Sequence, residues 1–494
     1  MKPDDLHGAP PEPTVSREEF LNLFASVFLP MFMAAVDQTL LATATPAIAA
    51  SLGGLRDTSW IAVAYLLASA VVVPVYGRLG DLRGRRNVLL GALALFTAGS
   101  LACGFAQSLP QLVAARVVQG AGGGGLMMLS QALIAELVPP RERARFQGYF
   151  AIVFTSASVG GPVLGGLVVS SLSWRWLFFA NLPLALFAAW RLLRLPAGEK
   201  HPGRSGLRDP AGIGLFFVGM STALFWLTAV GHHFSWRSPE SALLLAVAAT
   251  SLALLAWHQL RHPAPFLPVE LMRQRAIAFS VLTTALFASC MFAMVFFLPI
   301  YLQLGHHFSP TASGLLLLPL TAGMVTGSIT TGRIIARTGR PRLLPVFGLS
   351  VSSVALAALG IVPSNTFLVA LLGFVTGLGY GTVMPVNQVV AQTAAGRARL
   401  GAVTATISLA RSVGAATGAA LFGALIYAMM PDVDLRALVM SAAGGEGLAQ
   451  TLLRAFHRAF LGAAVVAALA AFAASRVPHV PLWGGESNAG AGGI

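Results

Sequence analysis

The sequence carries little charge for its length, and this scarcity excludes most classes of protein. Asp, Glu, Lys and Arg make up 10% of the 494 residues, against roughly 25% in an ordinary soluble domain. Hydrophobic residues make up 56% of the chain, and a helix that crosses a membrane needs about 20 of them. The composition therefore excludes a soluble enzyme, a disordered chain and a fibrous protein, and it predicts an integral membrane protein with many spans.

Cysteine and acidic residues are also scarce. Cys103 and Cys290 are the two cysteines, and both lie in apolar stretches without the spacing of metal ligands, which excludes a disulfide framework. The 18 acidic residues stand against 32 Lys and Arg, so the net charge is +14. Because the basic residues cluster between apolar runs, they are typical of cytoplasmic loops. We therefore expect no nucleic-acid partner.

Sequence motifs of common enzymes are missing as well. There is no Walker loop, no nucleophile elbow, no zinc-protease helix and no dinucleotide fingerprint. We expect a protein that is not an enzyme, that holds no cofactor or metal, and that does not hydrolyse ATP.

Apolar runs long enough to form spans recur along the chain, and we count fourteen of them. The runs cover residues 20–50, 60–75, 88–105, 112–137, 150–172, 176–193, 213–230, 243–257, 277–304, 312–335, 343–362, 367–390, 402–429 and 460–474. With both termini inside, 24 Lys and Arg fall on the inside, in loops, tails and the inner ends of runs, and six fall in outside loops. This bias supports the topology, because cytoplasmic loops are enriched in basic residues.

The runs divide the chain into five segments. These are a cytoplasmic tail (1–19), a six-helix bundle (20–195), an inserted two-helix segment with flanking cytoplasmic loops (196–275), a second six-helix bundle (276–477) and a disordered cytoplasmic tail (478–494). The roles of the insert and of an external loop at 431–455 stay open. The sequence predicts an all-α membrane protein.

An internal repeat relates the two bundles. The stretch Gly77–Arg85 resembles Gly332–Arg340 at an offset of 255 residues, and Gly120 matches Gly377 at an offset of 257. Transporters are often built from two such related halves. We interpret the offsets as a duplicated six-helix unit, with chance matching of glycine-rich helices as the alternative.

Two opposite charges lie within apolar runs of the first half. Asp37 is in the middle of the first run, and Arg116 is about one turn into the fourth. Ionisable groups inside a membrane usually mark an ion or substrate path, so the two are candidates for a proton-coupling pair. A neutral, packed Asp37 and an Arg116 that reaches the outer surface are the alternatives.

The connection after the second run is rich in glycine and arginine. Its glycines permit a tight turn and close approach of helices, and its acid can accept bonds from helix-terminal amides or from arginine. We expect it to hold one conformation closed, and the alternative is a solvated loop. The candidate residues are Gly77, Asp81, Gly84, Arg85, Arg86 and, at the end of the fourth run, Glu136.

Two further sets of residues are candidates for function. The fifth run carries Gly161, Pro162, Gly165 and Gly166, which favour close helix packing and a bend. Flexible or polar side chains in the spans are candidates to line a substrate cavity, with core packing as the alternative. This set is Gln38, Gln119, Met127, Gln131, Met291, Phe292, Met294, Phe296, Asn387 and Gln388.

Four motifs together resemble the major facilitator superfamily, and specifically its 14-spanner drug:proton antiporters of the EmrB/QacA type. Gly77–Arg86 is similar to the loop motif of the superfamily, and Arg116–Gly120 resembles its fourth-helix proton-transfer motif. Gly161–Gly166 is similar to the fifth-helix antiporter motif, and Asp37–Pro46 resembles the first-helix signature of these exporters. The resemblance implies two six-helix bundles plus two inserted helices, fourteen in all, that rock around a central site.

The resemblance also implies a function. It points to a proton-coupled antiporter of a bacterial cytoplasmic (inner) membrane, with both termini cytoplasmic, which exports lipophilic or cationic drugs and confers antibiotic resistance. A lipid or fatty-acid flippase or exporter, and an exporter of one metabolite or siderophore, are the alternatives. Membrane lipid, a periplasmic adaptor and an outer-membrane channel are the partners implied. The second half departs from the pattern, because Ala336 replaces the loop acid and Gly373 replaces the arginine.

Overall fold

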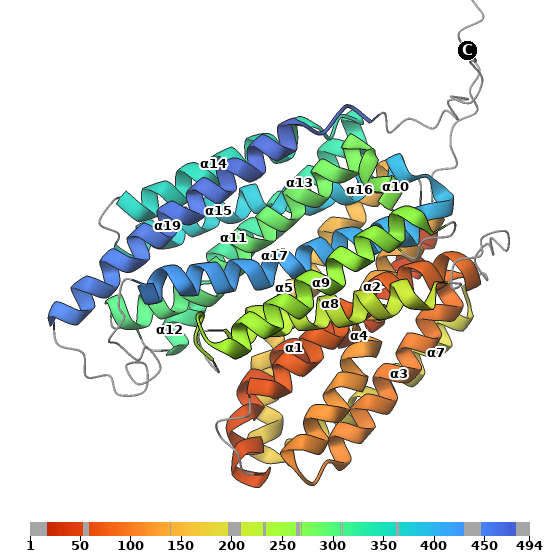
Figure 1. The fold of residues 1–494 in the computed structure, drawn as a ribbon, viewed down its shortest axis with the longest axis horizontal. Helices are drawn as coiled ribbons and strands as arrows, with labels where there is room; N and C mark the ends of the chain where they lie inside the picture. The colour runs from red at the N-terminus through yellow and green to blue at the C-terminus, as the bar shows by residue number, and fades with distance from the viewer. Residues whose placement is uncertain are drawn as a thin grey trace, which may run out of the picture.

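The computed structural model describes the chain as an array of long helices (Figure 1). The described residues are 17–52, 59–138, 140–195, 209–230, 234–262, 267, 269–306, 308, 310–361, 365–428 and 446–480. Within them the only β-type pairing is an isolated bridge between Val230 and Phe234. The expectation of an all-α protein is confirmed. Most of each predicted tail and most of the 431–455 loop lie outside the described residues.

The helices follow the order of the predicted runs. The first group is α1 (Arg17–Leu52), α2 (Ser59–Arg83), α3 (Arg85–Phe105), α4 (Leu109–Leu137), α5 (Pro140–Ser171), α6 (Trp176–Phe179) and α7 (Asn181–Leu193). The inserted pair is α8 (Pro210–Ala229) and α9 (Pro239–Arg261). The second group is α10 (Val269–Arg273), α11 (Arg275–His306), α12 (Pro310–Leu315), α13 (Leu318–Thr338), α14 (Leu343–Ile361), α15 (Thr366–Gly381), α16 (Val383–Ala395), α17 (Leu400–Ala428) and α19 (Glu446–Ser475).

Ten helical segments of the described chain are long and apolar enough to cross a membrane. They show a multi-pass membrane protein, whereas the count of fourteen spans stays a prediction. The helices α1, α5, α13 and α17 are not among the ten. Small and hydroxylated residues are frequent in α13, which lowers its hydropathy.

Three predicted runs are divided in the structure, and two helices start well before their runs. The tenth run becomes α12 and α13, and α5 begins at Pro140, ahead of the run at 150–172. The sixth run becomes α6 and α7, which meet at Ala180, and the twelfth becomes α15 and α16, which meet at Thr382. The last helix, α19, begins at Glu446, ahead of the run at 460–474. Its amphipathic first turns are too polar to be found by a search for apolar runs.

Glycines let the helices of each half pack closely. A Cβ at Gly120 would meet the backbone of Tyr65, and one at Gly377 would meet the backbone of Leu320. Both contacts join the fourth span of a half to its second span, α4 to α2 and α15 to α13. Tyr65 and Leu320 are themselves 255 residues apart, so the two halves repeat a packing contact as well as a sequence motif.

The two halves meet mainly along two pairs of helices, and α5 also contacts α16 and α4 contacts α17. The helix α5 packs against α13, and α2 packs against α17. The inserted helices α8 and α9 pack against each other, and α8 also contacts α2 and α17 at the side of this seam (Figure 1). The insert therefore lies beside the interface between the halves.

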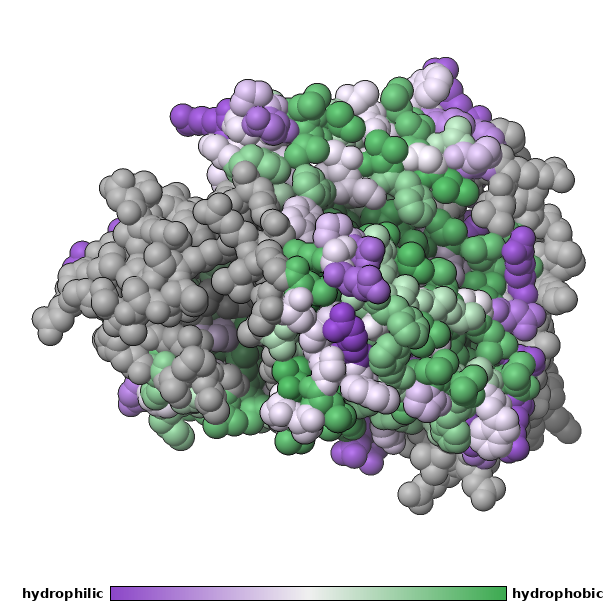
Figure 2. Space-filling model, turned by 90° about the horizontal axis from the view of Figure 1, so that it is seen from below, coloured by the Kyte–Doolittle hydropathy of each residue, from purple (hydrophilic) through white to green (hydrophobic). Residues whose placement is uncertain are grey.

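The outer surface is apolar, as expected of a chain embedded in lipid. Phe347 is 74% exposed and Phe367 is 75% exposed. Figure 2 shows apolar residues over much of the coloured surface of one face, with hydrophilic residues in separate patches. Burial against lipid removes the cost that such residues would have in water.

Candidate proton-coupling and gating sites

Asp37 and Arg116 form an ion pair inside the first half. The Arg116 Nη1 lies 2.5 Å from the Asp37 Oδ2, and the side chains are only 5% and 1% exposed. Asp37 is in α1 and Arg116 is in α4, so the pair joins two helices. The two residues are 79 positions apart in sequence. This contact places the two predicted coupling residues together, and Arg116 does not reach the outer surface.

Gln119 completes this site from one turn further along α4. Its amide nitrogen donates to the other Asp37 oxygen, Oδ1, at 2.8 Å, and its amide oxygen accepts from Arg116 at 2.7 Å. The same nitrogen lies 3.3 Å from the Ser100 hydroxyl of α3. Gln119 therefore bridges the acid and the base. In the sequence it is a candidate to line the cavity and also part of the fourth-helix motif.

The buried network continues into the sixth span. The Asn181 amide of α7 donates to Ser100 at 2.9 Å, and Ser100 donates to the Phe178 carbonyl at 2.9 Å. Neither Ser100 nor Asn181 was found from the sequence. Small polar residues are common in membrane helices, so only the register between α3, α4 and α7 reveals them.

Arg116 has further partners that fix its position. Its Nε donates to the Ile61 carbonyl of α2 at 3.1 Å, and its guanidinium lies 4.3 Å from the centre of the Tyr65 ring. A guanidinium keeps its charge in proteins and needs several acceptors when buried. The buried guanidinium is therefore held by a carboxylate, a backbone carbonyl, an amide oxygen and an aromatic ring.

The connection between α2 and α3 reaches across to the other half. The Asp81 carboxylate accepts hydrogen bonds from the backbone amides of Gly401 at 2.9 Å and Ala402 at 3.0 Å. These amides belong to the first turn of α17, where backbone donors lack partners and an anion is stabilised. Asp81 therefore caps a helix of the second half and holds the two halves together at this end.

Arginine and glutamate extend the Asp81 network on the side of the first half. Arg85 pairs with Asp81 at 2.5 Å and with Glu136 of α4 at 2.7 Å. Arg86 donates to the Leu195 carbonyl at 2.6 Å. The predicted loop is thus helical except at Gly84, with Gly77 and Asp81 in α2 and Arg85 and Arg86 in α3, and its charges form an ordered network.

The structure explains why glycine is needed at two positions of this stretch. Gly84 has a φ of 87°, which L side chains rarely adopt, and it forms the break between α2 and α3. A Cβ at Gly77 would lie 2.6 Å from the Ala405 Cβ and 2.7 Å from the Gly401 carbonyl oxygen. Gly77 therefore lets α2 approach α17 closely enough for the Asp81 cap.

The glycines of the fifth-run motif lie within the continuous helix α5. Gly161 and Gly165 are buried and Gly166 is half-buried. A Cβ at Gly166 would meet open space, so no close contact requires a glycine there. The Pro162 side chain lies outside the described residues, and the role of this motif stays a prediction.

The cavity candidates fall into two environments. Met291 and Met294 are buried in the apolar core of the second half, and Phe292 packs against it. Met127 packs against the core of the first half. Gln131, Asn387 and Gln388 carry buried amide atoms that have no hydrogen-bond partner within the described part of the chain. The Gln38 and Phe296 side chains lie outside it.

The polar candidates of the second half lie on α16. Asn387 donates to Thr284 at 3.0 Å and to the Ser280 carbonyl at 3.2 Å, which joins α16 to α11. Gln388 is fully buried with both amide atoms free among the described residues. Gln131 occupies the matching place in the first half, at an offset of 257 residues.

Comparison with known proteins identifies the family. A sequence profile of the Major Facilitator Superfamily matches residues 27–419. The chain belongs to this superfamily. A major facilitator protein is a transporter and not an enzyme, so the expectation of a non-enzymatic membrane protein is confirmed.

Relatives of this major facilitator protein include bacterial and fungal transporters. An uncharacterised MFS-type transporter of Mycobacterium tuberculosis is 36% identical over 407 residues, which cover 82% of this chain and 59% of the relative. The multidrug transporter protein MdtP of Bacillus subtilis is 32% identical over 82% of this chain and 75% of its own. The efflux pump FUS6 of Gibberella fujikuroi is 30% identical over 76% of this chain and 69% of its own.

Solved structures share the fold. The human organic anion transporter MFSD10 (TETRAN) superimposes with a TM-score of 0.63 at 18% identity, over 92% of this chain and 99% of its own. The proton:xylose symporter XylE superimposes with a TM-score of 0.58 at 14% identity, over 90% and 94%. At these identities the likeness establishes the major facilitator fold and nothing further.

Proposed function

We propose that this chain is a proton-coupled antiporter that exports lipophilic or cationic drugs and related amphiphiles by alternating access. The observation that carries the proposal is the buried ion pair of Asp37 and Arg116, bridged by Gln119. A buried ion pair contributes little net stability, because desolvation offsets its attraction. A role in moving protons explains why an acid and a base lie in an otherwise apolar bundle.

The chemistry follows from the unequal partners. A proton that enters from outside binds the Asp37 carboxylate and neutralises it. The attraction between Asp37 and Arg116 weakens, and Arg116 keeps the Gln119 oxygen and the Ile61 carbonyl as acceptors. Because Asp37 is on α1 and its partners are on α4, protonation loosens the contact between these helices. Substrate is released outward, and the empty carrier returns and gives up the proton inside.

The Asp81 contact with α17 acts as a gate, and the carrier changes between outward-facing and inward-facing states when this gate closes and opens. In the proposed topology the Asp81 cap on α17 lies at the cytoplasmic side, so the structure is closed to the cytoplasm. Opening this side requires Asp81 to leave the amides of Gly401 and Ala402. The affinity of Asp81 for these amides therefore sets how often the carrier faces inward.

The nature of the substrate is inferred from relatives and from the span interior. MdtP is a multidrug transporter and FUS6 an efflux pump, which supports export of drugs or secondary metabolites. The Gln131 amide oxygen and both Gln388 amide atoms lack a hydrogen-bond partner among the described residues, and they lie on equivalent helices of the two halves. Such groups can bind polar parts of varied ligands beside apolar side chains. We assign the chain to the 14-spanner exporters of a bacterial inner membrane, with a periplasmic adaptor and an outer-membrane channel as partners.

The test is transport of a lipophilic cationic dye by the protein in proteoliposomes under an imposed pH gradient. The proposal predicts dye movement that the gradient accelerates in wild type, and that the gradient does not accelerate in Asp37→Asn. Gradient-driven transport that persists unchanged in Asp37→Asn would contradict the coupling role. Lipid transfer that needs no gradient would favour the flippase instead.

A further inference from the structure

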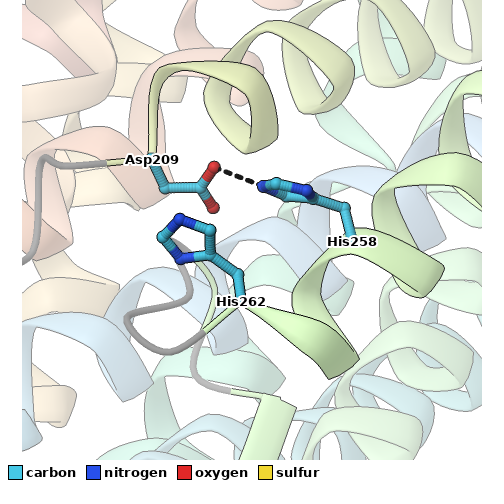
Figure 3. A group of neighbouring side chains, drawn as sticks. All are labelled: Asp209, His258 and His262. Carbon is cyan, nitrogen blue, oxygen red and sulfur yellow. Dashed lines mark hydrogen bonds and ion pairs between the residues drawn. The ribbon is translucent and has the colours of Figure 1, made fainter.

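A group of metal-ligand side chains lies at the end of the inserted helix pair, away from the coupling site. Asp209 precedes the first turn of α8, His258 is in the last turn of α9, and His262 follows that turn. Figure 3 shows the two imidazole rings converging on the Asp209 carboxylate. The ligand atoms of all three lie within 4.8 Å of one another.

The sequence places these side chains together for a simple reason. His258 and His262 are four residues apart, so they lie on one side of the helix end. The helices α8 and α9 pack against each other and run in opposite directions, which brings the start of α8 beside the end of α9. Neither histidine lies in an apolar run of the sequence, and no pattern there links them to Asp209.

Both carboxylate oxygens of Asp209 have hydrogen-bond partners. Its carboxylate is 1% exposed, and Oδ1 accepts from the Gly212 amide at 2.7 Å and lies 2.6 Å from the His258 Nε2. Oδ2 accepts from the Gln259 amide at 2.8 Å. Gln259 in turn accepts from the Leu267 amide at 3.0 Å. Supporting hydrogen bonds of this kind orient the ligands in metal sites.

We propose that Asp209, His258 and His262 bind a Zn²⁺ ion that joins the ends of α8 and α9. Two imidazole nitrogens and one carboxylate oxygen form a three-ligand set that zinc prefers, and water takes the fourth position of the tetrahedron. The side chain of His258 is 23% exposed, which leaves that position open to water. In the described part of the chain no other group of three such side chains is found.

Charge also favours a cation at this point. The Asp209 side chain is a buried acid, and a buried carboxylate is stabilised when it is paired with a cation or a metal. Zinc would replace the hydrogen bond between Asp209 and His258 by two stronger bonds and would recruit His262. The ion would thereby fix the insert, which packs beside the seam between α2 and α17.

The experiment measures zinc binding by the full-length protein in detergent, without a histidine tag and after removal of metal with a chelator. Calorimetry with Zn²⁺ alone gives the stoichiometry and affinity, and Co²⁺ gives an absorption spectrum that reports tetrahedral ligands. We expect one zinc site in wild type. In His262→Gln the zinc affinity should fall about tenfold or more, because changing a residue that only supports a ligand already costs about that much affinity.

The variants separate metal binding from folding. His262→Gln keeps the hydrogen bond between His258 and Asp209. In Asp209→Asn the side-chain oxygen can still accept from the Gly212 amide at the start of α8. His479→Gln is the control, because His479 is exposed and outside the group. Zinc should raise the unfolding temperature of wild type and of His479→Gln but not of His262→Gln. No zinc uptake by wild type, or equal affinity in wild type, His262→Gln and Asp209→Asn, would overturn the proposal.

Discussion

The first connection of each half turns at the same point of the repeat. Gly84 between α2 and α3 has a φ of 87°, and Gly339 between α13 and α14 has a φ of 64°. The two glycines are 255 residues apart. At Gly124 and Gly381, a Cβ would collide with the backbone of Ser69 and of Met324, which are again 255 residues apart. The backbones of the two halves thus follow one plan.

The charged residues do not repeat. Asp81 caps α17, whereas Ala336 stands at the matching place. Arg85 is buried between two acids, whereas Arg340 is exposed. Arg116 has its counterpart in Gly373, and the offsets place Asp37 opposite the apolar stretch 291–294 of α11.

The glycines that the fold requires are repeated in both halves, whereas the charged residues proposed for function are not. Close packing of glycines is required in both halves, because each bundle must bring its helices together. In the proposed mechanism one proton site serves the transport cycle, and a second buried ion pair would cost desolvation. The candidate coupling residues Asp37 and Arg116 both lie in the first half.

The largest effect is expected from breaking the ion pair. Arg116→Leu leaves the Asp37 carboxylate buried without its cation, which should lower the free energy of unfolding by about 3–5 kcal/mol. The double variant Asp37→Leu/Arg116→Leu should recover most of this stability, yet its transport should no longer respond to a pH gradient. Thermal unfolding of the purified variants measures the first effect. Equal stability of Arg116→Leu and wild type would contradict the account.

Breaking the shared packing should harm both halves alike. Gly124→Val and Gly381→Val force a side chain against a helix backbone, so each should lose about 1–3 kcal/mol of stability. Gly373→Ala is the matched control, because a Cβ there would meet open space. Unfolding temperatures compare the three. A loss confined to one half would show that the halves do not pack by the same contacts.

Changing Asp81 should shift the equilibrium between the closed and open forms of the proposed gate. Asp81→Asn removes the charge that binds the α17 amides, and hydrogen bonds to charged groups contribute about 1.5–3 kcal/mol. We expect the open population to rise about tenfold, since 1.4 kcal/mol is a tenfold change. Spin labels at the exposed positions Arg83 and Ala398 report this opening as a longer distance. Unlabelled Cys103 and Cys290 are buried, so they do not interfere. An unchanged distance distribution would remove Asp81 from the gate.

The smallest effect is expected from adding the acid to the second half. Ala336→Asp supplies the carboxylate, but Arg340 is exposed and not placed to pair with it. Stability should change by less than about 0.5 kcal/mol, as for ordinary surface substitutions, and dye transport should stay at the wild-type rate. A strong inhibition of transport would mean that the second connection is also a gate.

Much of the architecture could be predicted from the sequence. Apolar runs and the repeated glycine motifs predict the helices and the duplication, because both depend on local composition. The breaks at Ala180 and Thr382 could not be predicted, since they depend on packing against neighbouring helices. The early start of α19 also lies outside the apolar pattern.

The sites show the same limit. Asp37 and Arg116 stand out because charge is rare in a span, so their pairing was a sound prediction. The partner of Asp81 lies 320 residues away at Gly401, and no local signal identifies a backbone amide. Asp209, His258 and His262 are ordinary polar residues in sequence, and only the antiparallel contact of α8 and α9 brings them together.

Proton release on substrate binding tests the central claim most directly. A lipophilic cationic dye is added to the purified protein in weakly buffered solution, and a pH indicator follows the protons. If Asp37 is the group that exchanges a proton for substrate, wild type should release protons and Asp37→Asn should bind dye without release. Equal proton release by wild type and Asp37→Asn would contradict the assignment of coupling to the first half.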